Sequence, residues 1–362
     1  ERAPALRVGG YVVDFWGAGY EVADRMQLLP ALHKDAYRIK EVRLVDASGK
    51  RVTGLEVQLF EKATHDRYLS ILRSDLACRI YELVENRVET IFGDTITSLT
   101  EDSRGVTVSF ERNAPRRFHL VVGADGLHSA VRRLGFGDDK QYEQFLGYYV
   151  GAFTADNYPR RDEKAYVSYT VPRRSLARYA LRENRSAFLF IFAQDEILGV
   201  GHHDVAAQKS ILRERFSGMG WESAEILEAM DGADDLYFDP VSQISMDNWS
   251  RGRVTLVGDA AYCPSLLAGE GSGLAMAGAH RLANALAITG GDYQAAFRRY
   301  QQHFKPFVDD KQKSARRIAW WFAPRSKKAI WMRNVVTSLL NLPYIGDVFA
   351  PRLFGDDYEL PA

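Results

Sequence analysis

VTLVGDAAYCP, residues 254–264, is followed by LAGEGSGLA, residues 267–275, and this stretch decides the fold. A short apolar run ends at Asp259, and a glycine-rich turn then leads into a long helical pattern. This is typical of a buried strand whose carboxyl end meets a helix, the place where open α/β sheets bind their ligands. Asp259 can accept hydrogen bonds from ligand hydroxyls there. A simple helix cap in a glycine-tolerant turn is the alternative, because G-x-G runs are common.

The three glycines of this turn, Gly269, Gly271 and Gly273, have no Cβ atoms. Their backbone can therefore approach a flat ring closely and adopt positive φ angles. The free N–H groups and the positive dipole end of the helix that starts near Ser272 face the same spot. We therefore expect this turn to bind a flat ligand that carries negative charge.

A second segment, LVVGADGLHSAVR at residues 120–132, repeats the arrangement of a buried strand, a tight acidic turn and a helix. An Asp-Gly pair alone is usually just a turn. The combination of Asp125 and Gly126 with Ser129 and Arg132 is more specific. The apolar run from 118 to 122 is typical of a buried parallel strand.

Composition excludes several other classes of protein. The 47 basic and 47 acidic residues cancel, so no overall field attracts nucleic acid or an anionic membrane. Cys78 and Cys263 stand alone, which excludes a zinc cluster and a disulfide framework and favours a reducing cytoplasm. There is no run of 18 apolar residues. We expect no metal, no nucleic acid and no membrane anchor. We expect the aromatic C-terminal helices to pack against the rest of the chain and not to contact a bilayer.

Both acidic segments resemble the signature motifs of the FAD-dependent aromatic hydroxylases, the para-hydroxybenzoate hydroxylase-like flavoprotein monooxygenases. Within this family, the sequence is particularly similar to the subgroup that acts on polyketides and tetracyclines. The resemblance implies that FAD is the cofactor and that NAD(P)H is the co-substrate. It also implies that a C4a-hydroperoxide formed with O2 hydroxylates an aromatic or polycyclic small molecule. No catalytic side chain follows from it.

The resemblance also implies individual cofactor contacts. Asp259 would bind the ribityl and pyrophosphate part of FAD, and Asp125 would support FAD and NAD(P)H. Arg73, in LRSDL at residues 72–76, would lie near the phosphates. Glu1, with Arg2 beside it, would bind the adenosine ribose. The set that would lie against the isoalloxazine ring is Pro264, Gly269, Gly271, Ser272 and Gly273.

The sequence departs from the family at its start, because no G-x-G-x-x-G turn occurs before residue 258. That turn belongs about 20 residues before the ribose-binding acid. With Glu1 in that role, the first βα unit is expected upstream of residue 1. Tyr262 and Glu270 replace a frequent histidine and glutamine, and we expect them to tune the flavin.

The predicted fold is α/β with α+β elements: a Rossmann-like FAD-binding domain, an antiparallel-sheet substrate domain and C-terminal helices. The predicted FAD-binding domain is discontinuous, with residues 1–140 and 250–292. Aromatic-rich strands at 141–249 form the substrate domain, and helices fill 293–362. A helix from about 20 to 29 should end at Pro30, and Asp292 should cap a helix that is kinked at Pro306.

Four residues of the aromatic strands are candidates for binding a flat substrate: Tyr166, Arg178, Phe188 and Phe190. Half of such a set should point to the other face of the sheet as ordinary core. Arg178 could pair with a phenolate or carboxylate, the alternative being a solvated surface arginine. Two other functions remain open, a flavin dehydrogenase or halogenase of the same fold and a flavin-free binding scaffold.

Overall fold

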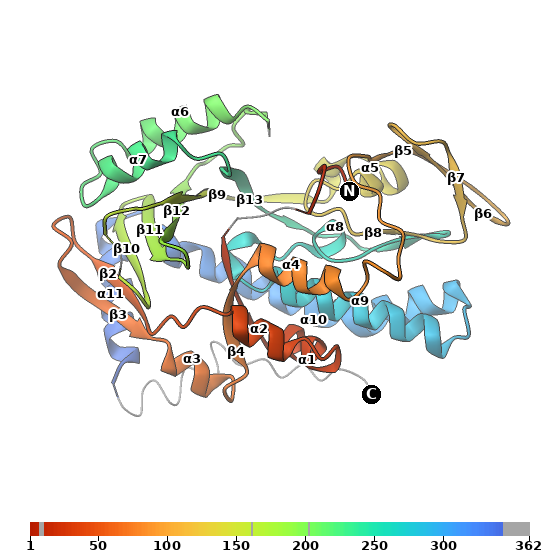
Figure 1. Ribbon diagram of the computed structural model, residues 1–362, viewed down its shortest axis with the longest axis horizontal. Coiled ribbons are helices and arrows are strands. Elements are labelled where there is room, and N and C mark those ends of the chain that lie inside the picture. Colours follow the sequence, from red (N-terminus) through yellow and green to blue (C-terminus); the bar gives the residue numbers. More distant parts are fainter. Residues whose placement is uncertain (7–10, 161, 202, 343–362) are drawn as a thin grey trace.

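A seven-stranded sheet occupies one end of the protein in the computed structural model, which describes residues 1–6, 11–160, 162–201 and 203–342 (Figure 1). The strand order is β13-β9-β12-β11-β10-β2-β3, and every pairing is antiparallel except β10 with β2. The strands are β9 (Glu143–Asp156), β10 (Ala165–Val171), β11 (Arg174–Ala180), β12 (Arg185–Ala193), β13 (Tyr237–Ile244), β2 (Glu41–Val45) and β3 (Arg51–Glu56). The sheet thus takes β2 and β3 from the segment that the sequence assigned to FAD binding.

Both faces of this sheet are covered. Helices α6 (Val205–Phe216) and α7 (Ser223–Asp231) lie on one face, above the sheet in Figure 1. Aromatic side chains fill the core beneath them, including Tyr149, Phe153, Phe188, Phe190 and Phe192. The opposite face packs against Leu267 of the glycine-rich turn and Leu72 of β4 (Tyr68–Leu72).

Two short parallel strands organise the other end of the molecule. β15 (Val254–Leu256) pairs in parallel with β8 (Val121–Gly123) and antiparallel with β14 (Ser250–Arg251). The two acidic motifs follow β8 and β15. The parallel strand predicted for 118–122 is confirmed for Val121 and Val122, but Val122 is exposed and Phe118 pairs antiparallel with Val106 in another sheet. The connected helices are α5 (Ala130–Phe136), η1 (Asp139–Gln141), α8 (Asp259–Tyr262), η2 (Leu266–Ala268) and α9 (Gly271–Ile288).

The N-terminal part joins these two ends. β1 (Val12–Trp16) pairs antiparallel with β4, and α1 (Gly17–Arg25) packs on α9. The predicted end of α1 at Pro30 was wrong: Pro30 lies in the first turn of a new helix, α2 (Leu29–Asp35). A proline fits there because the first N–H groups of a helix have no intrahelical acceptor. Helices α3 (Gln58–Ala63) and α4 (Arg73–Glu82) complete this part.

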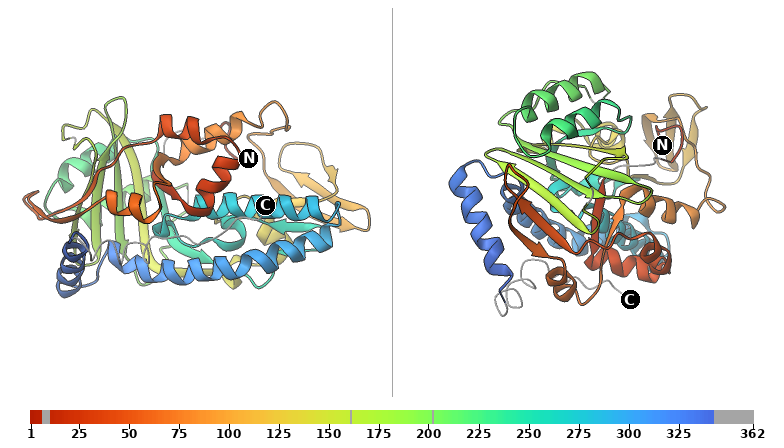
Figure 2. Two further views of the ribbon diagram at one scale, coloured as in Figure 1. Left: turned by 90° about the horizontal axis from the view of Figure 1, so that it is seen from below. Right: turned by 60° about the vertical axis from the view of Figure 1, so that its left-hand side comes forward.

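A long helix, α10 (Tyr293–Phe322), runs beneath both ends, as the left view of Figure 2 shows. Asp292 caps it by accepting hydrogen bonds from the N–H groups of Gln294 and Ala295, as predicted. The helix continues through Pro306. α11 (Lys327–Leu340) then packs on β3 and β10. β5 (Ile96–Asp102), β6 (Gly105–Phe110) and β7 (Arg116–Phe118) form a separate antiparallel sheet. Within the described ranges no helix is long and apolar enough to cross a bilayer.

Candidate cofactor site

The turn after β15 brings Asp259 against the glycine-rich loop. Gly258 has φ +64°, which lets the chain leave the strand sharply and place Asp259 at the start of α8. A Cβ atom on Gly271 would lie 3.5 Å from Oδ1 of Asp259. Ser265 has φ +125°, a conformation that costs energy for a residue with a side chain. The loop therefore combines close backbone approach with local strain, a combination common at ligand sites.

Arg73 and Asp259 lie within electrostatic range of each other. Burial raises the pKa of the Asp259 carboxyl, and the positive charge of Arg73 opposes that shift. Burial also raises the pKa of Tyr11 to about 12, and Arg73 again opposes it. The Arg73 side chain is exposed at the first residue of α4. A cation and a hydrogen-bond acceptor from separate segments thus face one region, and both suit an FAD phosphate and its ribityl hydroxyls.

The Asp125 motif is held rigidly beside this region. Asp125 accepts hydrogen bonds from the Ser129 hydroxyl and, at 3.0 Å, from the Val131 N–H, so it caps α5 while remaining exposed. The fully buried Arg132 ties the two motifs together, because its Nη1 donates to the Ala260 carbonyl at 2.9 Å. Arg132 belongs to the quoted motif, but its bridging role depends on contacts distant in the sequence.

Glu1 and Arg2 lie on the surface, beside the segment that follows α4. The Glu1 amino group donates to the Ile91 carbonyl at 2.9 Å, and its carboxylate accepts from the Ala3 N–H at 2.9 Å. Both residues are exposed. Glu1 thus lies against the segment that follows α4, whereas Arg73 begins that helix.

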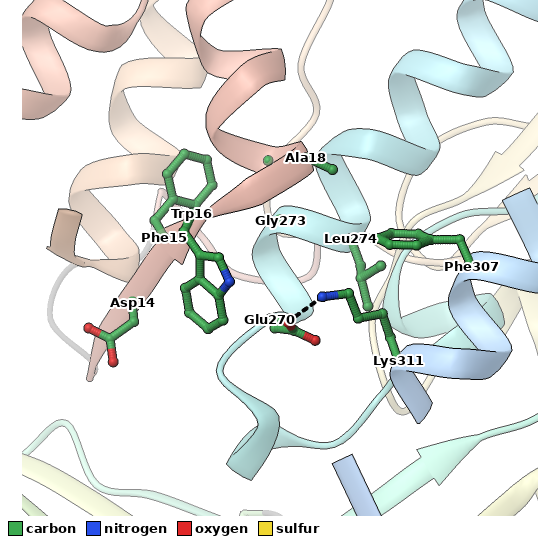
Figure 3. Close-up of a pocket in the computed structure, with 10 residues that line it drawn as sticks. Asp14, Phe15, Trp16, Ala18, Glu270, Gly273, Leu274, Phe307 and Lys311 are labelled. Carbon is green, nitrogen blue, oxygen red and sulfur yellow. Dashed lines mark hydrogen bonds and ion pairs between the residues drawn. The ribbon is translucent and has the colours of Figure 1, made fainter. Parts of the chain in front are cut away.

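A small pocket adjoins the glycine-rich loop (Figure 3). The Trp16 ring reaches the loop, since a Cβ on Gly269 would lie 3.7 Å from it. Lys311 of α10 donates to Glu270 at 2.7 Å across the same pocket. Ser272 and Gly273 open α9, and Pro264 is buried just before the loop. Trp16 and Lys311 were missed by the sequence analysis because neither lies in a recognisable motif.

Tyr166 projects toward the cofactor elements from the sheet. Its ring stacks with Tyr179 at a centroid distance of 6.0 Å, and the Tyr179 hydroxyl accepts from the Val12 N–H of β1 at 2.7 Å. Burial and the negative charge of Asp14 raise the pKa of Tyr166. Asp14 in turn accepts hydrogen bonds from the hydroxyls of Tyr68 at 2.5 Å and Ser70 at 2.6 Å.

The structure corrects the expected position of the other three substrate candidates. Phe188 and Phe190 lie in the core beneath α6 and α7, on the opposite face from Tyr166. Arg178 points to the same face as these two phenylalanines and is 4% exposed. The alternative interpretation of Arg178 as a solvated surface arginine was therefore also wrong. Its Nε donates to Glu222 at 2.6 Å and its Nη2 to Asp162 at 2.8 Å. Two carboxylates neutralise this guanidinium, which explains how it can be buried.

A larger cavity of about 870 Å³ opens between α2, α3, β4 and the start of β10. Many charged residues line it, among them Arg38, Lys40, Glu41 and Lys164. Tyr68 and Ser70 also line it, so the hydrogen bonds of Asp14 connect this cavity with the pocket beside the glycine-rich loop. No group of metal-ligating side chains occurs in the part of the chain that the structure describes.

Comparisons with known proteins agree with this geometry. The model of the FAD binding domain family matches residues 21–312. A flavin-dependent monooxygenase of Legionella longbeachae is 33% identical over 316 residues, covering 86% of this chain and 80% of that protein. An uncharacterized protein of Mycobacterium tuberculosis is 39% identical over 313 residues, with coverages of 86% and 84%.

Solved structures extend the match to the fold. The crystal structure of the tetracycline destructase Tet(55) superposes with a TM-score of 0.83 and 30% identity, covering all of this chain and 90% of that one. HpxO of Klebsiella pneumoniae, complexed with FAD and uric acid, has a TM-score of 0.77 at 19% identity over 98% of this chain and 90% of that one, a likeness of fold alone. The predicted fold class and the resemblance stated from the motifs are confirmed. The chain therefore belongs to the family of FAD-dependent, aromatic hydroxylase-like monooxygenases.

Proposed function

We propose that the chain uses NAD(P)H and O2 to hydroxylate an aromatic or polyketide-like small molecule. The balanced reaction converts substrate C–H, O2, NAD(P)H and a proton into C–OH, water and NAD(P)⁺. Bound FAD supplies the redox chemistry of this reaction. The observation that carries the proposal is the convergence of Arg73, Asp259 and the 269–273 loop opposite the Tyr166 face of the sheet.

In this proposal the protein binds FAD, orients the substrate and shields the reaction from water. Arg73 pairs with the FAD phosphates, and Asp259 accepts hydrogen bonds from the ribityl hydroxyls. The N-terminal N–H groups of α9 stabilise negative charge on the flat ring. Asp125 fixes the adjoining loop, and Glu1 and Arg2 remain candidates for the adenosine end. Tyr166 is the substrate candidate that we retain, because it packs in one cluster with Leu72 and Val12 of the cofactor part.

The domain division follows from the same proposal. Residues 1–140 and 250–292, without the 41–56 hairpin, form the cofactor part. The hairpin joins 141–249 in the substrate part, and α10 and α11 brace both. A reaction that consumes NAD(P)H is expected in the cytoplasm.

Cofactor binding is tested first. The purified chain is titrated with FAD, and uptake is followed by the flavin spectrum, for the wild type and for Arg73→Gln and Asp259→Asn. We expect each variant to weaken FAD affinity by about ten-fold or more, because each loses a charge-assisted hydrogen bond. Arg104→Gln, which removes an exposed cation from the β5–β6 turn, is the matched control.

Oxygen transfer is tested next. NAD(P)H oxidation is measured with a panel of phenolic and polyketide compounds, and the product mass is determined under ¹⁸O2. Incorporation of one labelled oxygen atom supports the proposal. Substrate oxidation without incorporation would identify a dehydrogenase instead, and a folded chain that takes up no FAD would favour the binding scaffold.

A further inference from the structure

Arg333 is a buried cation on the cofactor side of the sheet. Tyr166, Ser168 and Thr170 are alternate residues of β10, so all three project from the same face. Nη1 of Arg333, on α11, donates to the Thr170 hydroxyl at 3.1 Å. Arg333 is 4% exposed, and its charge acts on Tyr166. The guanidinium therefore lies on the face that carries the one retained substrate candidate.

The other buried arginines show what is unusual about Arg333. Three arginines are buried among the described residues: Arg132, Arg178 and Arg333. Arg132 pairs with Asp139 at 2.8 Å, and Arg178 pairs with two carboxylates. Within the same described ranges, Arg333 has no carboxylate within ion-pair distance. A buried charge without a counter-charge is costly, so such groups are uncommon unless a ligand completes them.

The neutral contacts of Arg333 do not use all of its donors. A guanidinium has five N–H groups. Four hydrogen bonds are formed, two to Asn334 and one each to Thr170 and the Trp321 carbonyl. One N–H therefore has no acceptor in the described part of the chain. Burial accordingly lowers the pKa of Arg333 to about 10, which still leaves the group charged at neutral pH.

We propose that Arg333 recognises an anionic oxygen of the substrate, a carboxylate, phenolate or enolate, bound against the Tyr166 face of the sheet beside α11. This inference rests on the proposed function, because it assigns the substrate of that site to a chemical class. Arg333 then acts as a specificity residue. A planar guanidinium already fixed by Thr170 and Trp321 offers its remaining donor in one direction, so it selects for the position of the negative charge.

The experiment compares two ligands of the same shape, one with a carboxylate and one with a neutral carboxamide at the same position. Binding of 3-hydroxy-2-naphthoate and of the neutral 3-hydroxy-2-naphthamide is measured calorimetrically at pH 7.5 with excess FAD present. The variants are Arg333→Gln and Arg333→Lys. Arg325→Gln is the matched control, because Arg325 lies just before α11, is half-exposed and already pairs with Asp195 at 3.1 Å.

We expect the wild type to bind the naphthoate about ten-fold more tightly than the naphthamide, the value of one charge-assisted hydrogen bond. Arg333→Gln should abolish that preference and leave naphthamide affinity within about two-fold, whereas Arg333→Lys should retain most of it. Arg325→Gln should resemble the wild type. A merely structural role would weaken both ligands together and would not be rescued by lysine.

The inference is overturned if the wild type shows no preference for the naphthoate, including the case in which neither ligand binds. It is also overturned if the preference survives in Arg333→Gln or disappears equally in Arg325→Gln. Failure of the proposed function is seen separately, in the absence of FAD uptake or of labelled oxygen in the product.

Discussion

Gly19 is the position where one added methyl group should disturb the cofactor site most directly. Gly19 of α1 faces Gly273, at the start of α9, across the contact between these helices. A Cβ on Gly19 would lie 2.4 Å from the Gly273 Cα and 3.0 Å from Cε2 of Phe15. Carbon atoms pack at about 3.5–4.0 Å, so the helices must separate by about 1 Å. Gly19→Ala should therefore cost about 1–3 kcal/mol of unfolding free energy, as overpacked cores do.

The same shift should reach the cofactor, because α9 begins in the glycine-rich loop. We expect Gly19→Ala to lower the melting temperature by about 1–4 °C. FAD affinity should fall by about ten-fold or more, measured by titration of the flavin spectrum. The reciprocal variant Gly273→Ala is the structural control. Its Cβ would make only ordinary contacts, the nearest 3.6 Å from the Gly19 Cα, so its melting temperature should not fall. A Gly19→Ala protein as stable and as tight for FAD as the wild type would refute this reasoning.

Two further predictions concern ion pairs. Glu222→Gln should destabilise the protein by about 3 kcal/mol in urea unfolding, because it leaves the buried Arg178 with Asp162 as its remaining carboxylate. Asp195→Asn, which removes two exposed ion pairs, with Arg173 and Arg325, should cost under about 1 kcal/mol. Equal costs of the two substitutions would contradict the argument. Burial lowers the pKa of His128, but the hydrogen bond and charge of Asp239 outweigh this and raise it. The stabilisation from the His128–Asp239 pair should therefore be complete below about pH 6.5 and be lost as the pH rises through the raised pKa of the folded state. A His128→Gln protein whose unfolding free energy keeps the same pH dependence would exclude this pair as its source.

Local patterns predicted the elements that carry the cofactor motifs. The apolar runs before Asp125 and Asp259 form the parallel pair β8 and β15, and Asp292 caps α10. These features depend on residues close together in the sequence. Pro30 shows the limit of such signals, because a proline is compatible both with the end of one helix and with the first turn of the next.

The aromatic strands could not be assigned to faces from their pattern. In β12, Phe188 and Phe190 face α6 and α7, whereas Leu189 and Ile191, which alternate with them, pack toward the cofactor side. Because both faces of the sheet are covered, residues 187–193 of this strand are all apolar, and the alternation that normally marks the buried face is lost. The partner of Arg178 was equally hidden, since Glu222 lies 44 residues further along the chain.

The two faces of the sheet nevertheless differ in chemistry. The face beneath α6 and α7 is filled by stacked aromatic rings, and its one buried arginine is neutralised. The cofactor face carries a row of hydroxyls, in which Ser175 bonds to Ser168 and Thr170 at 3.1 Å each. A core that excludes all solvent gains little from such groups, because burying a hydroxyl costs desolvation free energy and buries little apolar surface. Hydroxyls and an uncompensated guanidinium on a single face are therefore better explained by contact with a polar ligand than by packing, and this asymmetry supports the location of the substrate on the Tyr166 face.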